Sequence, residues 1–88
     1  MPTISMFYGI IVRMYSEPNS PHHEPHIHVE YARQNAVIAL DGHVISGNIP
    51  DNKLKMVQVW MDIHQEDLQA NWSLLYSGEP AFKIEPLK

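Results

Sequence analysis

The chain has 88 residues, of which 44% are hydrophobic and 18% are charged, and it contains no cysteine. A chain of this length has room for one hydrophobic core, so we expect a single domain over residues 1–88. The composition excludes a disordered chain, and the absence of cysteine excludes disulfides and thiolate chemistry. A net charge of −4 argues against an extended surface for duplex nucleic acid.

No segment predicts export or membrane insertion. The first residues lack the basic region of a signal peptide. The longest apolar run, Met6–Val12, contains Gly9 and is too short to cross a bilayer. We therefore expect a soluble, cytoplasmic protein.

The first third of the chain predicts two strands separated by a loop. Ile4–Tyr15 is rich in β-branched and aromatic residues and predicts one long strand. Glu17–Pro21 contains two prolines and predicts a loop, because proline cannot donate to a strand ladder. His26–Tyr31 then predicts a short second strand.

A hairpin is predicted next. Asn35–Leu40 and His43–Ser46 are two apolar stretches that flank the pair Asp41-Gly42. An Asp-Gly pair between alternating apolar residues is a strong hairpin signal, because glycine supplies the positive φ of a type I′ turn. These stretches therefore predict a third and a fourth strand.

Beyond the hairpin, the hydrophobic period changes to that of a helix. Pro50 and Asp51 suit the start of a helix, and Gly78 suits its end. The sequence leaves open whether this region is one bent helix or two, and Gln65–Asp67 is the expected bend. Phe82–Ile84 predicts a last edge strand. The predicted fold class is therefore α+β, with a small antiparallel sheet of four to five strands and a C-terminal helical region packed on one face.

Histidines are concentrated in one segment, because four of the six fall within residues 22–28. His26 and His28 are two positions apart on a predicted strand, so their side chains project to the same face. They could bind a divalent metal such as zinc together with His22, or they could act as an acid and a base. The alternative is a solvated polar strand face without a site.

Two residues outside this segment are further candidates. If the first two predicted strands pair so that Tyr15 faces His26, Arg13 faces His28 on the same face, and the three side chains could hold an anion or a phosphodiester. His64 ends the apolar stripe of the helical region and could join the site, although a partly buried histidine at a helix end is the plainer interpretation.

Several short motifs resemble one bacterial family, the domain of unknown function 4160. The motifs are Gly9–Tyr15, Pro25–His28 with Tyr31, Ile49-Pro50, Asn71-Trp72 and the ending Ile84–Leu87. Members are small cytoplasmic proteins often encoded beside a domain-of-unknown-function 2442 protein. The resemblance implies that such a pair is a toxin–antitoxin module and that this chain is its toxin.

The family's histidine pattern can be compared with this chain position by position. His22, His26 and His28 match its histidines, whereas Glu24 replaces a proline and Ile27 replaces an aromatic residue. The resemblance supplies no catalytic roles, but it strengthens Arg13, His22, His26, His28 and His64 as candidates.

Three functions follow from these observations. The leading hypothesis is a toxin with an undefined target, which could be RNA, neutralised by a small antitoxin-like partner; if it is an enzyme, we expect a hydrolase or ribonuclease that uses histidines. The second is a metal-binding enzyme or sensor. The third is a non-catalytic interaction module with the helices over Leu54–Tyr76 as its docking face. The low charge content also allows a homodimer.

Overall fold

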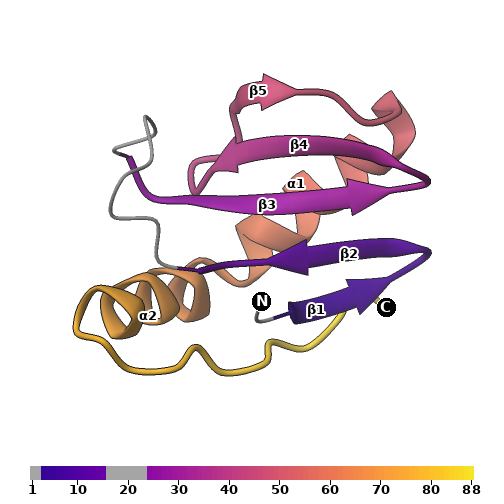
Figure 1. Cartoon of the computed structure of the whole chain (residues 1–88). Helices are drawn as coiled ribbons and strands as arrows, with labels where there is room; N and C mark the ends of the chain where they lie inside the picture. The colour runs from indigo at the N-terminus through magenta and orange to yellow at the C-terminus, as the bar shows by residue number, and fades with distance from the viewer. Residues whose placement is uncertain (1–2, 16–23) are drawn as a thin grey trace.

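Five strands form one antiparallel sheet in chain order, and two helices follow them (Figure 1). This computed structural model describes residues 3–15 and 24–88. The elements are β1 (Thr3–Phe7), β2 (Ile10–Arg13), β3 (His26–Tyr31), β4 (Gln34–Ala39), β5 (Val44–Gly47), α1 (Asp51–Ile63) and α2 (Gln65–Tyr76). The predicted α+β class, with an antiparallel sheet and a C-terminal helical region, is confirmed. The predicted loop Glu17–Pro21 lies outside the described residues.

The first two strands are a hairpin that the sequence did not predict. Tyr8 and Gly9 join β1 to β2, with φ angles of 50° and 80°. Positive φ at both central residues is the signature of a type I′ turn. The prediction of one long strand over Ile4–Tyr15 is therefore wrong, because Gly9 allows the apolar run to reverse.

The other two turns of the sheet differ from each other, and only the second was predicted from the sequence. Ala32 and Arg33 join β3 to β4, and both have positive φ although neither is glycine. At the predicted Asp41-Gly42 hairpin only Gly42 has positive φ, and its N–H donates to the carbonyl of Ala39 at 2.8 Å. The hairpin between β4 and β5 is confirmed, but its turn is a longer loop with glycine in the left-handed position, and the type I′ prediction is wrong.

The helical region is two helices rather than one. His64 lies between them with φ −108° and ψ 29°, which breaks the helical path one residue before the predicted bend at Gln65–Asp67. Gly78 follows α2 with φ 80°, and the N–H of Glu79 donates to the carbonyl of Leu74 at 2.8 Å. This is the Schellman arrangement, so the predicted glycine stop is confirmed.

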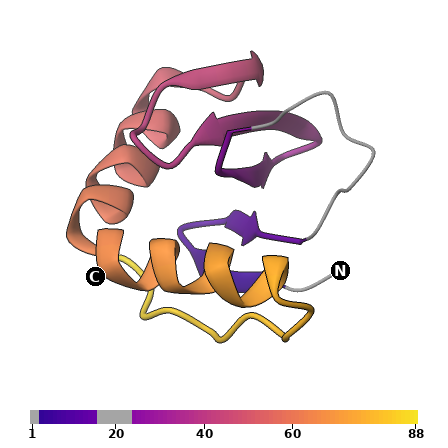
Figure 2. The ribbon, with the colours of Figure 1, turned by 90° about the vertical axis from the view of Figure 1, so that its left-hand side faces the viewer.

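The helices enclose the core from two directions. Figure 2 shows α1 beside one face of the sheet. The second helix, α2, runs at a steep angle to α1 and passes the end of the strands. Trp60 of α1 is fully buried and its ring lies 5.4 Å from that of Phe7. Neither helix in the described part of the chain is long and apolar enough to span a membrane.

The C-terminal tail, residues 79–88, runs beside β1 without becoming a strand (Figure 1). The buried side chain of Asn71 holds the backbone of Phe82 through two hydrogen bonds of 2.8 Å. The indole Nε1–H of Trp60 donates to the carbonyl of Glu85 at 2.7 Å. The predicted edge strand Phe82–Ile84 is therefore wrong, because side chains rather than a backbone ladder hold this segment.

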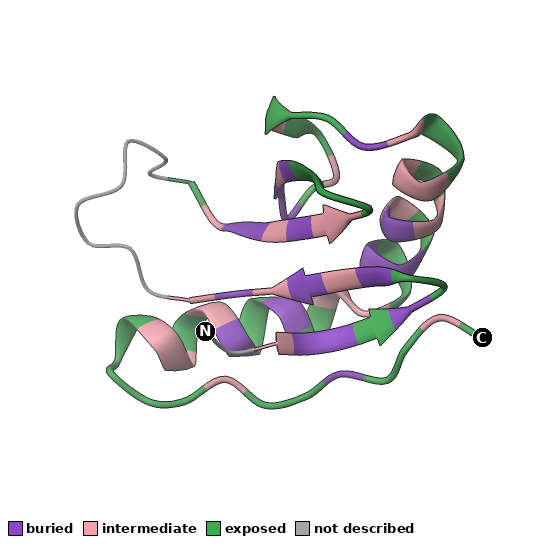
Figure 3. Ribbon diagram, turned by 45° about the vertical axis from the view of Figure 1, so that its right-hand side comes forward, coloured by how far each residue is buried: buried purple, intermediate pink, exposed green. Residues whose placement is uncertain are grey.

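The two faces of the sheet differ in polarity. Figure 3 shows buried and less buried positions alternating along the strands. The buried positions of β2, such as Ile10 and Val12, belong to the core. Arg13, His28 and Glu30 are only partly buried. This second face, which we call the open face, therefore presents two of the predicted site residues, Arg13 and His28.

Candidate functional site

Arg13 and His28 face each other across the β2–β3 pair, in the register that the sequence analysis proposed. Directly opposed residues of antiparallel strands have Cβ atoms about 4.5–5.5 Å apart. The guanidinium and the imidazole therefore extend from neighbouring points on the open face.

Aromatic rings group around His28. The ring of Tyr15 stacks on that of His28, with centroids 4.5 Å apart and planes inclined by 15°. The ring of His26 meets that of His28 edge-on at 5.2 Å. We refer to Arg13, Tyr15, His26 and His28 together as the β2–β3 site.

His26 is the buried member of the β2–β3 site. It is 2% exposed, because α2 brings Trp72 to 5.3 Å from its ring. Its Nδ1 lies 2.8 Å from the carbonyl oxygen of Glu24. A carbonyl can only accept a hydrogen bond, so Nδ1 carries a proton and, in the neutral ring, Nε2 is the basic nitrogen. The backbone thus fixes both the tautomer and the orientation of this ring.

Arg13 is held by an ion pair. Its Nη1 donates to Oε1 of Glu30 at 2.7 Å, and the two side chains are 28% and 38% exposed. A partly exposed pair of this kind contributes about 0–1 kcal/mol to stability. Guanidinium has five N–H donors, so Glu30 orients Arg13 while leaving donors that can bind an anion.

Two predicted site residues are not brought into this group. His22 lies outside the described residues. His64 lies at the junction of the helices, where its ring is 5.6 Å from that of Trp60 and its Nδ1 is 3.9 Å from Oδ2 of Asp67. Trp72, which covers His26, lies eight positions further along the chain, or about 12 Å of helix. His64 is therefore part of the break between α1 and α2 and not of the group around His28.

The described residues do not form a metal site by themselves. In residues 3–15 and 24–88, no group of three or more His, Cys, Asp or Glu side chains is placed to hold a metal ion. The predicted zinc set requires His22 in addition to His26 and His28. That set stays a prediction.

A second histidine arrangement lies at the turn between β4 and β5. Nδ1 of His43 is 2.6 Å from Oδ1 of Asp41, and its Nε2 is 3.5 Å from Oε1 of Glu24. The hydrogen bond to Asp41 raises the pKa of His43. The backbone N–H and then the ring of His43 lower the pKa of Asp41. All three side chains are at least half exposed, so this turn is a solvated polar group.

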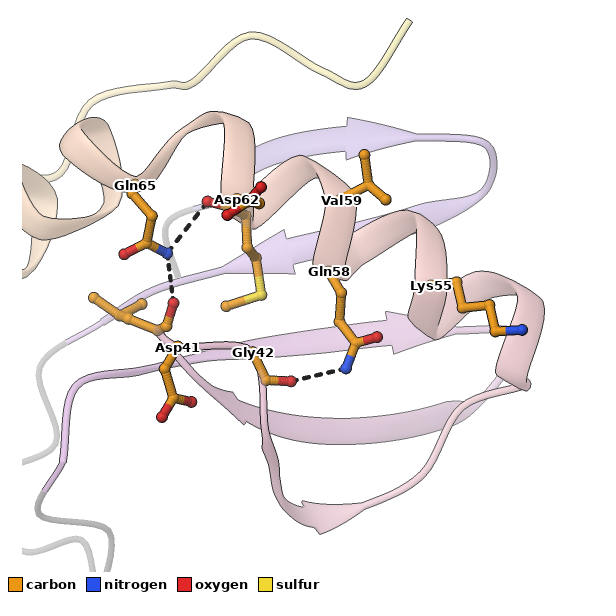
Figure 4. A pocket seen from close by; sticks show the side chains of 9 residues that line it. Asp41, Gly42, Lys55, Gln58, Val59, Asp62 and Gln65 are labelled. Carbon is orange, nitrogen blue, oxygen red and sulfur yellow. Dashed lines mark hydrogen bonds between the residues drawn. The ribbon is translucent and has the colours of Figure 1, made fainter.

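A hollow without a predicted site residue lies elsewhere, between α1 and the β4–β5 turn (Figure 4). It has a volume of about 630 Å³. The side-chain amide of Gln58 donates to the carbonyl of Gly42 at 2.9 Å, and that of Gln65 donates to the carbonyl of Leu40 at 2.5 Å. Gln58 of α1 and Gln65 at the start of α2 thus fasten both helices to the turn. The sequence gives no signal for this hollow, whose lining contains no histidine.

Comparison with known families assigns the chain to one of them. The model of one family, described as Domain of unknown function (DUF4160), matches residues 9–73. The match includes every residue of the β2–β3 site. Searches among curated proteins and among solved structures gave no match. Because the family model covers most of the chain, the protein belongs to the DUF4160 family.

Proposed function

We propose that this protein is the cytoplasmic toxin of a bacterial toxin–antitoxin pair and that the β2–β3 site cleaves RNA. The observation that carries the proposal is the position of Arg13 opposite His28, with the ring of His26 at 5.2 Å from that of His28. This arrangement places an anion-binding guanidinium beside an imidazole that can act as a general base and then as a general acid.

Acid–base cleavage of RNA needs these functions and no covalent attachment to the protein. In the proposed reaction, the partly exposed His28 accepts the proton of a 2′-hydroxyl, and the oxygen attacks the adjacent phosphorus. The bond to the 5′-oxygen breaks, His28 returns the proton to that oxygen, and a 2′,3′-cyclic phosphate remains. The buried His26 meets the ring of His28 edge-on and holds it in position. Arg13 stabilises the negative charge that develops on the phosphate oxygens.

Because the overall charge is negative, a single-stranded RNA would be bound only through local contacts at the site. A net charge of −4 gives little long-range attraction for RNA. The proposed site instead uses one guanidinium and the ring stack of Tyr15 on His28, since aromatic rings can also stack on unpaired bases. The partner is proposed to be a small antitoxin of the domain-of-unknown-function 2442 type.

The proposal is tested by expression in a bacterial host. We would induce the wild type, His28→Asn and His43→Gln to equal levels, and follow growth and the integrity of total RNA. The wild type and His43→Gln should arrest growth and degrade RNA, whereas His28→Asn should do neither. Growth arrest with intact RNA would contradict a ribonuclease, and arrest by His28→Asn would remove the β2–β3 site from the activity.

Metal binding is the second candidate, because His26 and His28 are adjacent and His22 precedes them in the chain. It predicts bound zinc or nickel in the purified wild type and much less in a His26→Ala/His28→Ala double variant. Equal metal content in the two proteins would exclude this function.

A further inference from the structure

A small hollow adjoins His28 on the open face, over β3, β4 and β5. It has a volume of about 160 Å³, which is the space that about five water molecules occupy in the liquid. The side chains that line it on this face are those of His28, Asn35, Val37 and Ser46, and the backbone of the three strands forms its floor. We call it the His28 hollow.

The register of the sheet explains why the surface is hollow here. Val37 is directly opposite His28 on one side and directly opposite Ser46 on the other. Directly opposed residues of antiparallel strands project to the same face. Neighbouring strands lie about 4.8 Å apart, so His28 and Ser46 are about 10 Å apart, with the short side chain of Val37 between them. This gap is wide enough for one flat ring.

Asn35 and Ser46 give the hollow hydrogen-bonding groups that the described chain does not use. Asn35 is two positions from Val37 on β4, so both side chains project to the same face. Asn35 and Ser46 are exposed, and within residues 3–15 and 24–88 neither side chain makes a hydrogen bond. An amide and a hydroxyl each supply a donor and an acceptor. They can therefore bind a ligand that carries donors and acceptors along one edge.

The backbone fixes the two strands that carry these polar groups. Gly47 ends β5 with φ 73°, and a Cβ atom there would clash with the carbonyl oxygen of Asn35. That carbonyl accepts a hydrogen bond of 3.0 Å from the N–H of Asn48. Glycine permits both the φ angle and the close approach, so Ser46 is held at a fixed distance from Asn35.

The hollow is neutral, although the chain has a net charge of −4. None of the residues that line it is Asp, Glu, Lys or Arg. Glu30 is directly opposite Asn35, but its carboxylate is paired with Arg13 at 2.7 Å. Arg13 lies on the side of His28 away from the hollow, because His28 is directly between Arg13 and Val37. A neutral ligand in the hollow can therefore extend a phosphate past His28 toward Arg13.

We infer that the His28 hollow binds one unpaired base of the RNA, and this inference rests on the function proposed above. The edge of a base presents the donors and acceptors that Asn35 and Ser46 can pair with. The base is that of the nucleotide whose 2′-hydroxyl attacks, because the ribose carbons that carry the base and this hydroxyl are neighbours. A base held beside His28 thus brings its own hydroxyl to the imidazole, and Asn35 and Ser46 determine which base is preferred.

Binding is tested with nucleotides that cannot be cleaved. The four nucleoside 3′-monophosphates are titrated separately into the whole ¹⁵N-labelled protein, beside inorganic phosphate. The preferred nucleotide should shift the side-chain amide signals of Asn35 and the backbone signals of Ser46 and Gly47. It should bind about tenfold more tightly than the weakest of the four. Inorganic phosphate should leave these signals in place.

Three variants separate recognition from folding. Asn35→Ala should weaken binding of the preferred nucleotide about two- to tenfold, because one or more hydrogen bonds are lost. Val37→Phe places a ring in the hollow and should abolish the shifts at Ser46. Gln34→Ala changes the neighbouring exposed residue, which projects to the other face, and should bind as the wild type does. Urea denaturation checks that each variant still unfolds cooperatively.

The outcomes distinguish this inference from the proposed reaction. Base-dependent binding that Asn35→Ala weakens, in a protein that leaves RNA intact, would support the hollow and overturn only the reaction. The absence of shifts at millimolar nucleotide, equal binding of all four nucleotides, or wild-type binding by Asn35→Ala and Val37→Phe would overturn the inference. Cleavage of RNA without preference for the base on the 5′ side of the cut would also overturn it, while the proposed reaction would stand.

Discussion

The two faces of the sheet carry different side chains from the same strands. The face toward α1 carries Ile10, Val12 and Val29, all of which are almost fully buried. The open face carries Arg13 and His28 at positions directly adjacent along the same strands. Because side chains alternate along a strand, the covered face can determine stability while the open face remains available for chemistry.

His26 lies on the same face of the sheet as His28 but is buried. The helix α2 passes the end of the strand there, and Trp72 covers the ring of His26. The contact with Trp72 and the hydrogen bond to the carbonyl of Glu24 together fix the orientation of the ring. His43 is instead half exposed, and its partners are solvated carboxylates. The two histidines therefore differ in burial as well as in hydrogen bonding.

The largest expected effect is on the covered face. Trp60→Ala removes a fully buried ring and its bond to the carbonyl of Glu85, and should lower the free energy of unfolding by about 3–5 kcal/mol. Urea denaturation measures the change. The neighbouring Val59 is 53% exposed, so Val59→Ala is the matched control. Equal losses from the two variants would show that α1 does not pack as described.

A smaller loss is expected where α2 holds the tail. Asn71→Ala removes both hydrogen bonds to the backbone of Phe82 and truncates a fully buried side chain. The free energy of unfolding should fall by about 1–3 kcal/mol, again by urea denaturation. Gln69 is exposed on the same helix, and Gln69→Ala should change stability little. A neutral Asn71→Ala would mean that the tail is not anchored there.

On the open face, stability and activity should separate. Arg13→Gln breaks a partly exposed ion pair with Glu30, so we expect a stability change below about 1 kcal/mol. Cleavage of RNA should fall about 10²-fold or more, because charge stabilisation of the transition state is lost. Arg33→Gln, in an exposed turn, is the control for net charge. Parallel losses of stability and activity in Arg13→Gln would contradict the separation of faces.

The smallest effect is expected at His43. Its pKa in the folded protein is raised above the ordinary value of 6.5, so its pairing with Asp41 stabilises the fold below that pH and the contribution disappears as the pH rises through the raised value. The lowered pKa of Asp41, from an ordinary value of 3.8, sets the acid limit, below which the pairing is also lost. The difference in melting temperature between wild type and His43→Gln should be largest between these limits and vanish in alkali. A difference that grows with pH would contradict this assignment.

Much of the fold could be predicted from local patterns. The alternation in β3, the Asp41-Gly42 hairpin and the Gly78 helix end each depend on a few neighbouring residues. The turn at Tyr8 was missed because the apolar run on both sides reads as continuous strand, and only Gly9 signals the reversal. The composition of Phe82–Ile84 predicts a strand, but the side chains of Asn71 and Trp60 that hold the tail come from helices and cannot be inferred from this local pattern.

The candidate site was predictable in part. Alternation and an assumed register placed Arg13 beside His28, and the pairing of β2 with β3 confirms that register. The cover of His26 by Trp72 depends on the angle at which α2 passes the sheet, which hydrophobic spacing does not contain. For His64, the plainer interpretation of the sequence was a histidine at a helix end, and the structure places it at the junction of α1 and α2.

The central claim, that the β2–β3 site cleaves RNA by histidine acid–base chemistry, is tested most directly with purified protein. Two synthetic oligonucleotides of one sequence, one RNA and one DNA, are incubated with wild type and His28→Asn across a range of pH, with and without a chelator. We predict cleavage of RNA only, no effect of the chelator, and a loss of about 10²-fold or more in His28→Asn at unchanged thermal stability. Intact RNA, equal cleavage of DNA, or full activity of His28→Asn would contradict the claim.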